Sequence, residues 1–236
     1  MKDLFMVQAI GVIQSPYKEK FAIPRQPNLV TTIESEIHLC GAMNSIDSVR
    51  ALDEFSHLWV MFYFHQTAAR SWQPLVRPPR LGGNKKVGVL ASRSTHRPNP
   101  IGLSLVECLS IREQAGQVSI KIKGGDFVDG TPVIDIKPYL PYADTADNAS
   151  VGYAPQPSGL EKTVSFSPQS ETVIAKLSTS LPNLKRSIEE VLLQDPRPGY
   201  RRGQNEDRLY GVKLYDFNIK FKFTEQCIWV AAIEAE

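Results

Sequence analysis

The residues of this sequence that are suited to chemistry lie in short polar segments, each close to an apolar, strand-like run. Residues 88–100, GVLASRSTHRPNP, begin as a strand and continue into a turn with Arg93, Arg97 and a Pro-Asn-Pro sequence. Proline fixes its own backbone angle and restricts the residue before it, so this turn is rigid. A guanidinium group in a rigid turn is suited to recognise a carboxylate, a phosphate or a purine edge. The segment therefore predicts a site for a charged ligand.

Three further segments supply complementary groups. Residues 126–132, DFVDGTP, carry two carboxylates and a glycine at a tight turn. Carboxylates beside a basic loop can bind ribose hydroxyls, hold a ligand cation or accept a proton. The other two segments are residues 23–27, IPRQP, and the pair His65-Gln66 at the end of an apolar run. Each segment alone is explained by turn chemistry and surface ion pairs, but together they favour a pocket at the mouth of a barrel.

Charge is distributed unevenly along the chain. The formal net charge is +2, yet the 52 positions between Glu54 and Glu107 contain no acidic residue. The same stretch contains seven arginines and lysines and three of the four histidines. A segment that is free of carboxylates and rich in cations suits a polyanion such as a phosphate, a nucleotide or RNA. A solvated basic surface is the alternative interpretation.

Several common kinds of site are excluded by missing patterns. The sequence has no glycine-rich dinucleotide or phosphate loop and no nucleophile elbow. Its histidines show no HxxxH or HExxH spacing, and Cys40, Cys108 and Cys227 form no CxxC pair, so we expect no metal site. The same three isolated cysteines are typical of a reducing compartment, and we expect the protein to be cytoplasmic. No apolar run approaches the roughly 20 residues that span a bilayer, so we expect no membrane attachment.

The elements that position these segments are predicted to be mostly short strands. Strand-like runs are expected at residues 6–13, 36–39, 57–65, 87–91, 103–111, 117–122 and 133–136. Residues 57–65, HLWVMFYFH, are apolar throughout, as in a strand that is buried on both faces. One helix is expected at residues 45–55, capped by Ser45. Many short strands and hardly any helix predict a mainly β protein with a compact β-barrel, and a doubly wound sheet is rejected because its crossover helices are missing.

The second part of the chain has a different pattern. Helices are expected at residues 169–178 and 184–193, and two strands follow at 217–224 and 227–232. A small, polar, proline-containing stretch separates these elements from the predicted barrel. We therefore predict a barrel domain over residues 1–147, a linker over 148–160 and a smaller α+β domain over 161–236.

Together these motifs resemble the TsaA-like, or TrmO-like, protein family. The resemblance rests on five segments in order, SPYKEKFAIPRQP, FSHLWV, VRPPRLGGN, GVLASRSTHRPNP and DFVDGTPVIDIKPYLPYAD, which cover most of residues 7–147. Leu90 stands where the family pattern leads us to expect phenylalanine, a departure that affects packing more than chemistry. The sequence DPRPGY at residues 195–200 is also similar to the extra domain of the bacterial members.

The resemblance implies a β-barrel methyltransferase that uses S-adenosyl-L-methionine and modifies tRNA. In this family the methyl group goes to N6 of the threonylcarbamoyladenosine immediately 3′ of the anticodon in threonine tRNAs. The resemblance also implies a homodimer with the cofactor close to the subunit interface. Carried over by motif, the cofactor contacts are Pro24, Arg25, Gln26, His65, Gln66, Arg93, Leu103, Asp126, Phe127, Val128 and Asp129.

These residue types suit the implied cofactor, which carries a carboxylate, an ammonium and a sulfonium. Arg25 and Arg93 match the anionic group, and Asp126 and Asp129 match the cationic ones. Because the sulfonium methyl is already activated, in-line positioning supplies much of the catalysis. The target nitrogen is a poor nucleophile whose proton has to be removed, and the sequence leaves the base open among Asp126, Asp129 and His65.

Contacts to tRNA are expected from basic and aromatic residues outside this site. The candidates for phosphate binding are Arg70, Arg77, Arg80, Lys85, Lys86, Arg197, Arg201 and Arg202, and those for base stacking are Tyr139, Tyr142 and Tyr200. Two alternatives remain: a non-catalytic RNA-binding barrel and a small-molecule methyltransferase. The paired carboxylates disfavour the first, because acids weaken phosphate binding, and the acid-free stretch disfavours the second.

Overall fold

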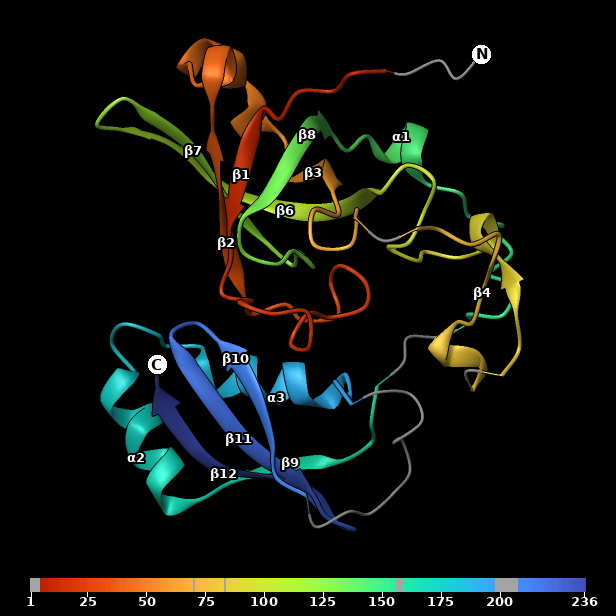
Figure 1. The fold of residues 1–236 in the computed structure, drawn as a ribbon. Coiled ribbons are helices and arrows are strands. Elements are labelled where there is room, and N and C mark those ends of the chain that lie inside the picture. Colours follow the sequence, from red (N-terminus) through yellow and green to blue (C-terminus); the bar gives the residue numbers. More distant parts are fainter. Residues whose placement is uncertain (1–4, 70, 83, 156–158, 198–207) are drawn as a thin grey trace.

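The computed structural model describes residues 5–69, 71–82, 84–155, 159–197 and 208–236. Strands dominate it: the first part of the chain forms a closed barrel, and the second part forms a four-stranded sheet with two helices (Figure 1). The prediction of a mainly β fold with a non-Rossmann barrel and a C-terminal α+β unit is confirmed.

Six antiparallel strands close the barrel in the order β1-β2-β7-β6-β3-β8. Their bounds are Gly11–Gln14 for β1, Glu34–Leu39 for β2, His57–Tyr63 for β3, Ile101–Gln114 for β6, Gln117–Lys123 for β7 and Thr131–Pro138 for β8. β1 pairs with both β2 and β8, which joins the first strand to the last and leaves no open sheet edge.

Smaller elements lie outside the barrel wall. β4 (Leu75–Val76) and β5 (Val87–Gly88) form a two-stranded sheet apart from the barrel wall, and α1 (Pro141–Asp144) follows β8 (Figure 1). The strand expected at residues 87–91 is therefore shorter than predicted, because Val89–Ala91 turn into a 3₁₀ helix.

The barrel strands bury mainly one face. In β7 the apolar residues Val118, Ile120 and Ile122 are all buried as predicted, and Lys121 between them is partly exposed, although Ser119 is buried as well. In β3 the expectation of burial on both faces is wrong: Leu58 and Phe62 point into the core, whereas the residues between the buried positions are partly exposed. A barrel wall has one face toward its core and one toward its surroundings, so successive side chains alternate between them.

The helix expected at residues 45–55 is also wrong. The chain forms two short 3₁₀ helices there, Ile46–Val49 and Leu52–Glu54. Ser45 does cap the first, because its side chain accepts a hydrogen bond from the backbone N–H of Asp47. Between them Ala51 adopts a left-handed conformation with φ 63°, which an α-helix does not tolerate.

The C-terminal part contains a sheet in the order β10-β11-β12-β9 with two helices. Its elements are β9 (Thr163–Phe166), α2 (Pro168–Leu177), α3 (Leu184–Leu193), β10 (Tyr210–Leu214), β11 (Phe217–Phe223) and β12 (Cys227–Ala235). Both helices match the predicted ranges within a residue, and α3 buries Leu184, Ile188, Val191 and Leu192 on one face. β9 pairs in parallel with β12, and the other pairs are antiparallel.

Two hydrophobic cores result, and one of them joins the two parts of the chain. Side chains from the barrel strands form the first core. The second contains the buried faces of α3 and the C-terminal sheet together with Tyr17, Ala22, Val30 and Ile33 from the connection between β1 and β2. This connection lies between the barrel and the C-terminal sheet in Figure 1.

Candidate active site

Three barrel connections carry the four predicted segments to one end of the barrel. Residues 23–27 lie between β1 and β2, residues 126–129 lie between β7 and β8, and both His65 and Arg93 lie between β3 and β6. β1 pairs with β2 and β3 with β6 as antiparallel neighbours, so the end of each first strand adjoins the start of its partner. The end of β7 lies at the same mouth because Lys123 pairs with Glu34 at the start of β2, and the start of β8 lies there because Thr131 pairs with Ile13 in β1. The topology thus places the segments around one barrel mouth.

Hydrogen bonds tie these segments to one another. Arg93 donates from Nη1 to Oε1 of Gln26, which joins the GVLASRSTHRPNP turn to the IPRQP segment. Lys20 Nζ donates to the backbone oxygen of Gln66 at 2.9 Å, which joins the β1–β2 connection to the end of β3. Thr67 Oγ1 donates to the backbone oxygen of Thr95 at 3.4 Å.

Asp126 combines burial with a specific partner. Its Oδ1 accepts a hydrogen bond from Ser104 Oγ at 2.5 Å, and Ser104 itself is fully enclosed in β6. Desolvation raises the pKa of Asp126 to about 6, against the opposing effects of the Ser104 hydrogen bond, its own backbone N–H and the positive charge of Arg93. A carboxylate with this pKa is ionised at neutral pH yet more basic than an exposed aspartate, as a proton acceptor requires.

Asp129 has a different environment and holds two segments together. Its Oδ1 accepts the backbone N–H of Ser15 at 2.8 Å, and its Oδ2 pairs with Lys18 Nζ at 3.0 Å. Its own backbone N–H donates to the carbonyl of Tyr17 at 2.8 Å. Both carboxylate oxygens are therefore engaged in bracing the β1–β2 connection against the β7–β8 turn.

His65 is half-buried at the end of β3. Desolvation lowers its pKa, and the charge of Lys20 lowers it further, although a hydrogen bond with the backbone of Tyr63 acts in the opposite sense. The imidazole is therefore neutral at physiological pH and carries a lone pair.

Three of the predicted site residues do not direct their side chains into the barrel mouth. Phe127 is buried and packs edge-on against Phe62 with ring centroids 4.9 Å apart, and Val128 is buried as well, so their backbone is the part that remains for a ligand. Leu103 is 52% exposed and alternates with the enclosed Ser104, so its side chain lies on the outer face of the wall. Leu103 remains a prediction.

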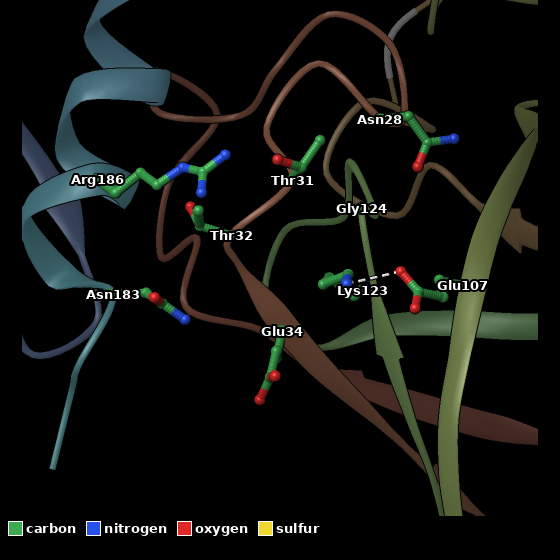
Figure 2. A pocket seen from close by; sticks show the side chains of 9 residues that line it. All are labelled: Asn28, Thr31, Thr32, Glu34, Glu107, Lys123, Gly124, Asn183 and Arg186. Atoms are coloured by element: carbon green, nitrogen blue, oxygen red, sulfur yellow. Dashed lines mark ion pairs between the residues drawn. The ribbon is translucent and has the colours of Figure 1, made fainter.

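Two pockets lie between the barrel and the C-terminal part, beside this mouth. The larger has a volume of about 380 Å³ and is lined by Asn28, Thr31, Thr32, Glu34, Glu107, Lys123, Gly124, Asn183 and Arg186. Figure 2 shows Arg186 on one side of it and the Lys123–Glu107 ion pair on the other, and none of the predicted cofactor residues lines it. The smaller includes Arg25.

The sequence reasoning missed Ser104 and Lys20. Ser104 had a detectable signal: in Ile101–Gln114 it occupies an inward position between Gly102 and Val106, where a polar side chain requires a partner. No sequence signal indicated Lys20, because its contact with the backbone of Gln66 depends on how the β1–β2 connection folds.

The candidate tRNA contacts differ in their exposure. Arg77, Arg80, Lys85 and Lys86 are exposed between β4 and β5. Arg70, Arg201, Arg202 and Tyr200 lie outside the described residues.

The suggestion that Arg197 binds phosphate is wrong: its guanidinium pairs with Asp195 at 2.8 Å, lies 3.5 Å from the centroid of Phe223 and is buried. Tyr142 is 87% exposed, whereas Tyr139 packs against His57 and Trp59.

In the described part of the chain, no three His, Cys, Asp or Glu side chains gather in a way that would hold a metal ion. Within the same ranges, no helix has the length and apolar character that crossing a membrane requires.

A closed β-barrel with charged loops at one mouth, joined to an α+β unit, is the class of protein that these observations define. Residues 12–145 match the family model of the tRNA-methyltransferase O N-terminal domain, and residues 160–236 match that of the TrmO C-terminal domain. The chain belongs to the TrmO family.

Similar proteins agree with this assignment. The chain is 50% identical over 230 residues, 98% of both chains, to the tRNA (adenine(37)-N6)-methyltransferase of Escherichia coli K12. It is 40% identical over 219 residues, 92% of both chains, to a putative S-adenosylmethionine-dependent methyltransferase, RcsF, of Pseudomonas aeruginosa. A crystal structure of TrmO from P. aeruginosa superposes with a TM-score of 0.79 at 34% identity, covering 98% of both chains. The predicted family and the predicted class, a methyltransferase that uses S-adenosyl-L-methionine, are confirmed.

Proposed function

We propose that this protein transfers the methyl group of S-adenosyl-L-methionine to N6 of the threonylcarbamoyladenosine immediately 3′ of the anticodon in threonine tRNAs. Support for a tRNA N6-methyltransferase comes from the family and from the relative that acts on adenine 37. The single observation that supports the chemistry is that the positive charge of Arg93 acts on Asp126 and lowers its pKa against the effect of desolvation, so that groups of both charges are available to one ligand.

The cofactor is held by the loops of this mouth. We assign this task to Pro24, Arg25, Gln26, His65, Gln66, Arg93, Leu103, Asp126, Phe127, Val128 and Asp129. The hydrogen bond from Arg93 to Gln26 supports a shared site, because it joins two of the segments directly. Arginine suits the amino-acid carboxylate of the cofactor, since it can bind both oxygens at once. Leu103 lies on the outer wall, which fits a site completed by a second subunit.

The bound cofactor supplies a methyl group that its sulfonium has already activated. Asp126 accepts the proton that N6 of the target loses as the new N–CH₃ bond forms. Its raised pKa suits this role, and Arg93 and Ser104 keep the carboxylate ionised. Asp129 is the weaker candidate because Ser15 and Lys18 occupy its two oxygens.

The tRNA approaches over the β4–β5 region. Arg77, Arg80, Lys85 and Lys86 are exposed there, in the stretch that lacks acidic residues, and contact phosphates. Tyr142 is exposed near the end of β8 and stacks on an unpaired base of the anticodon loop.

We also propose that the protein is a cytoplasmic homodimer and that its domains span residues 1–147 and 161–236, with a linker at 148–160.

Two measurements test this function. S-adenosyl-L-methionine at about 100 times its Kd is expected to stabilise the folded protein by about 2.7 kcal/mol, and no stabilisation would favour a non-catalytic RNA-binding barrel. Threonine tRNA from a strain that lacks this gene is expected to gain one methyl group at the modified adenosine. A cofactor-binding protein that leaves this tRNA unmethylated would point instead to a small-molecule substrate.

The assignment of Asp126 is tested by Asp126→Asn. The amide still accepts the Ser104 hydrogen bond but cannot take a proton, so the methylation rate constant is expected to fall about 10² to 10⁴-fold. Asp129→Asn serves as the matched carboxylate control and is expected to lower this rate constant much less. A rate constant that survives in Asp126→Asn would remove the assignment.

A further inference from the structure

The connection between β1 and β2 is built into the core of the C-terminal domain. It runs from Ser15 to Ile33 without helix or strand. Tyr17 and Ile33 are almost fully enclosed, in the same hydrophobic core as Ile188 of α3 and Phe221 of β11. A connection of this length keeps one conformation only where other elements pack against it, so the C-terminal domain determines its shape.

Hydrogen bonds anchor the C-terminal end of this connection to a single carboxylate. Glu190 of α3 accepts the backbone N–H groups of Thr31 at 2.6 Å and of Thr32 at 3.1 Å. It also accepts both threonine hydroxyls, at 3.2 and 3.0 Å. A further partner is Arg186, with Nε 3.1 Å from Oε1. A carboxylate that receives this many donors fixes the backbone more firmly than a neutral acceptor does.

The N-terminal end of the connection is anchored to β10 and the turn that follows it. The backbone N–H of Tyr215 donates to the carbonyl of Pro16 at 2.8 Å, and that of Lys213 donates to Oε1 of Glu19 at 3.1 Å. The C-terminal domain therefore holds both ends of the connection. Its middle carries Gln26, which accepts the hydrogen bond from Arg93.

We propose that the C-terminal domain shapes the cofactor site, with Glu190 as the positioning residue that holds residues 23–27 against Arg93. This rests on the proposed assignment of Pro24, Arg25 and Gln26 to the cofactor. A loop that is ordered before binding loses less conformational entropy when the ligand arrives, so its anchoring contributes to affinity. The carboxylate of Glu190 acts through the loop and does not touch the cofactor.

The test is Glu190→Gln in the full-length protein, because the amide keeps the shape but turns one acceptor into a donor that faces other donors. We expect the Kd and the KM for S-adenosyl-L-methionine to rise about 5- to 20-fold, with the KM for tRNA unchanged. Glu189→Gln, one position earlier on α3, removes the same charge and is expected to leave both constants as in the wild type. Equal cofactor affinity in the two variants would overturn the proposal.

Hydrogen exchange without cofactor separates this proposal from the cofactor assignment. In Glu190→Gln the amides of residues 17–32 are expected to exchange faster than in Glu189→Gln, while the barrel strands exchange as before. Unchanged exchange in the connection would overturn the proposal. Faster exchange with an unchanged Kd would overturn it as well, and Arg25→Ala then identifies the cause: if its Kd is also unchanged, the loop does not contact the cofactor.

Discussion

Ser104 donates a hydrogen bond of 2.5 Å to the carboxylate of Asp126, and this contact sets how readily the proposed base accepts a proton. Burial disfavours the ionised carboxylate, and the Ser104 hydroxyl favours it. Together with the lowering effects of its backbone N–H and of Arg93, these leave Asp126 with a pKa of about 6, so the carboxylate is ionised at neutral pH. The alternating pattern of β6 places Ser104 on the enclosed face of the barrel wall.

Ser104→Ala is expected to shift the pH dependence of methylation. Activity requires ionised Asp126, so the rate falls as the pH drops through its pKa, which is about 6 in the wild type. Without the hydroxyl the pKa rises further, and the acidic limb of kcat/KM against pH moves up by about one unit. Ser119→Ala removes another buried serine on β7 and serves as the control. A limb that stays in place would show that Asp126 is not the titrating base.

Asp126→Asn is expected to stabilise the fold at neutral pH. The pKa of Asp126 is raised on folding, from 3.8 to about 6, so the folded state binds the proton more tightly and loses stability as the pH rises through this window. Replacing the carboxylate removes that loss, and the free energy of unfolding rises by roughly 1 to 3 kcal/mol at pH 7.5. Urea unfolding checks the prediction. The gain must vanish below pH 3.8, where the wild-type carboxyl is neutral in both states.

Tyr17→Phe is expected to leave the stability unchanged or slightly raised. Tyr17 is fully buried, and within the described ranges its hydroxyl has no hydrogen-bond partner, so its removal costs no bond to these residues. Tyr17→Ala, in contrast, empties part of the core shared with the C-terminal domain and is expected to cost about 3 to 5 kcal/mol. Thermal unfolding of the two variants checks this. A clear destabilisation in Tyr17→Phe would show that the hydroxyl has a partner after all.

Gly102→Ala is expected to disturb the barrel next to the site. A Cβ atom there would clash with the ring of Phe62, and this ring packs edge-on against Phe64 and Phe127 with centroid distances of 5.0 and 4.9 Å. Because the ring can move away only by shifting against these aromatic neighbours, overpacking costs about 1 to 3 kcal/mol. Gly88→Ala is the control, since nothing lies within 4 Å of its added atom. Phe62→Leu in the Gly102→Ala background is expected to recover part of the loss, whereas no recovery would contradict this explanation.

The sequence predicts secondary structure and the buried face correctly where the spacing of apolar residues follows from a single buried face. The burial of the apolar positions in β7 and the apolar face of α3 were both predicted correctly, although Ser119 in β7 is buried too. The error in β3 arose because an apolar outer face is indistinguishable in sequence from a second buried face. The burial of Arg197 depends on Phe223, which is distant in the sequence, and no local pattern contains that contact.

The same limit applies to the site. The four polar segments were predicted to meet because strands end near them. Two hydrogen bonds join the β1–β2 connection to the β3–β6 connection, and a third joins two parts of the β3–β6 connection. The different roles of Asp126 and Asp129 were not predictable. The first has a serine from a neighbouring strand, and the second has a backbone N–H and a lysine from the β1–β2 connection. Such differences follow from the tertiary neighbours of each carboxylate, whereas their residue type is the same.

Lys85→Gln/Lys86→Gln is expected to weaken tRNA binding without affecting the cofactor. Both lysines are exposed beside β5, in the stretch without acidic residues. A glutamine cannot neutralise a phosphate, so each substitution reduces the number of counterions that tRNA binding releases. The slope of log Kd for tRNA against log salt concentration is expected to fall by about one unit per lysine. Lys176→Gln/Lys185→Gln removes two charges from the C-terminal domain and is the matched control. An unchanged slope in the first variant, or an equal change in the second, would place the tRNA elsewhere on the protein.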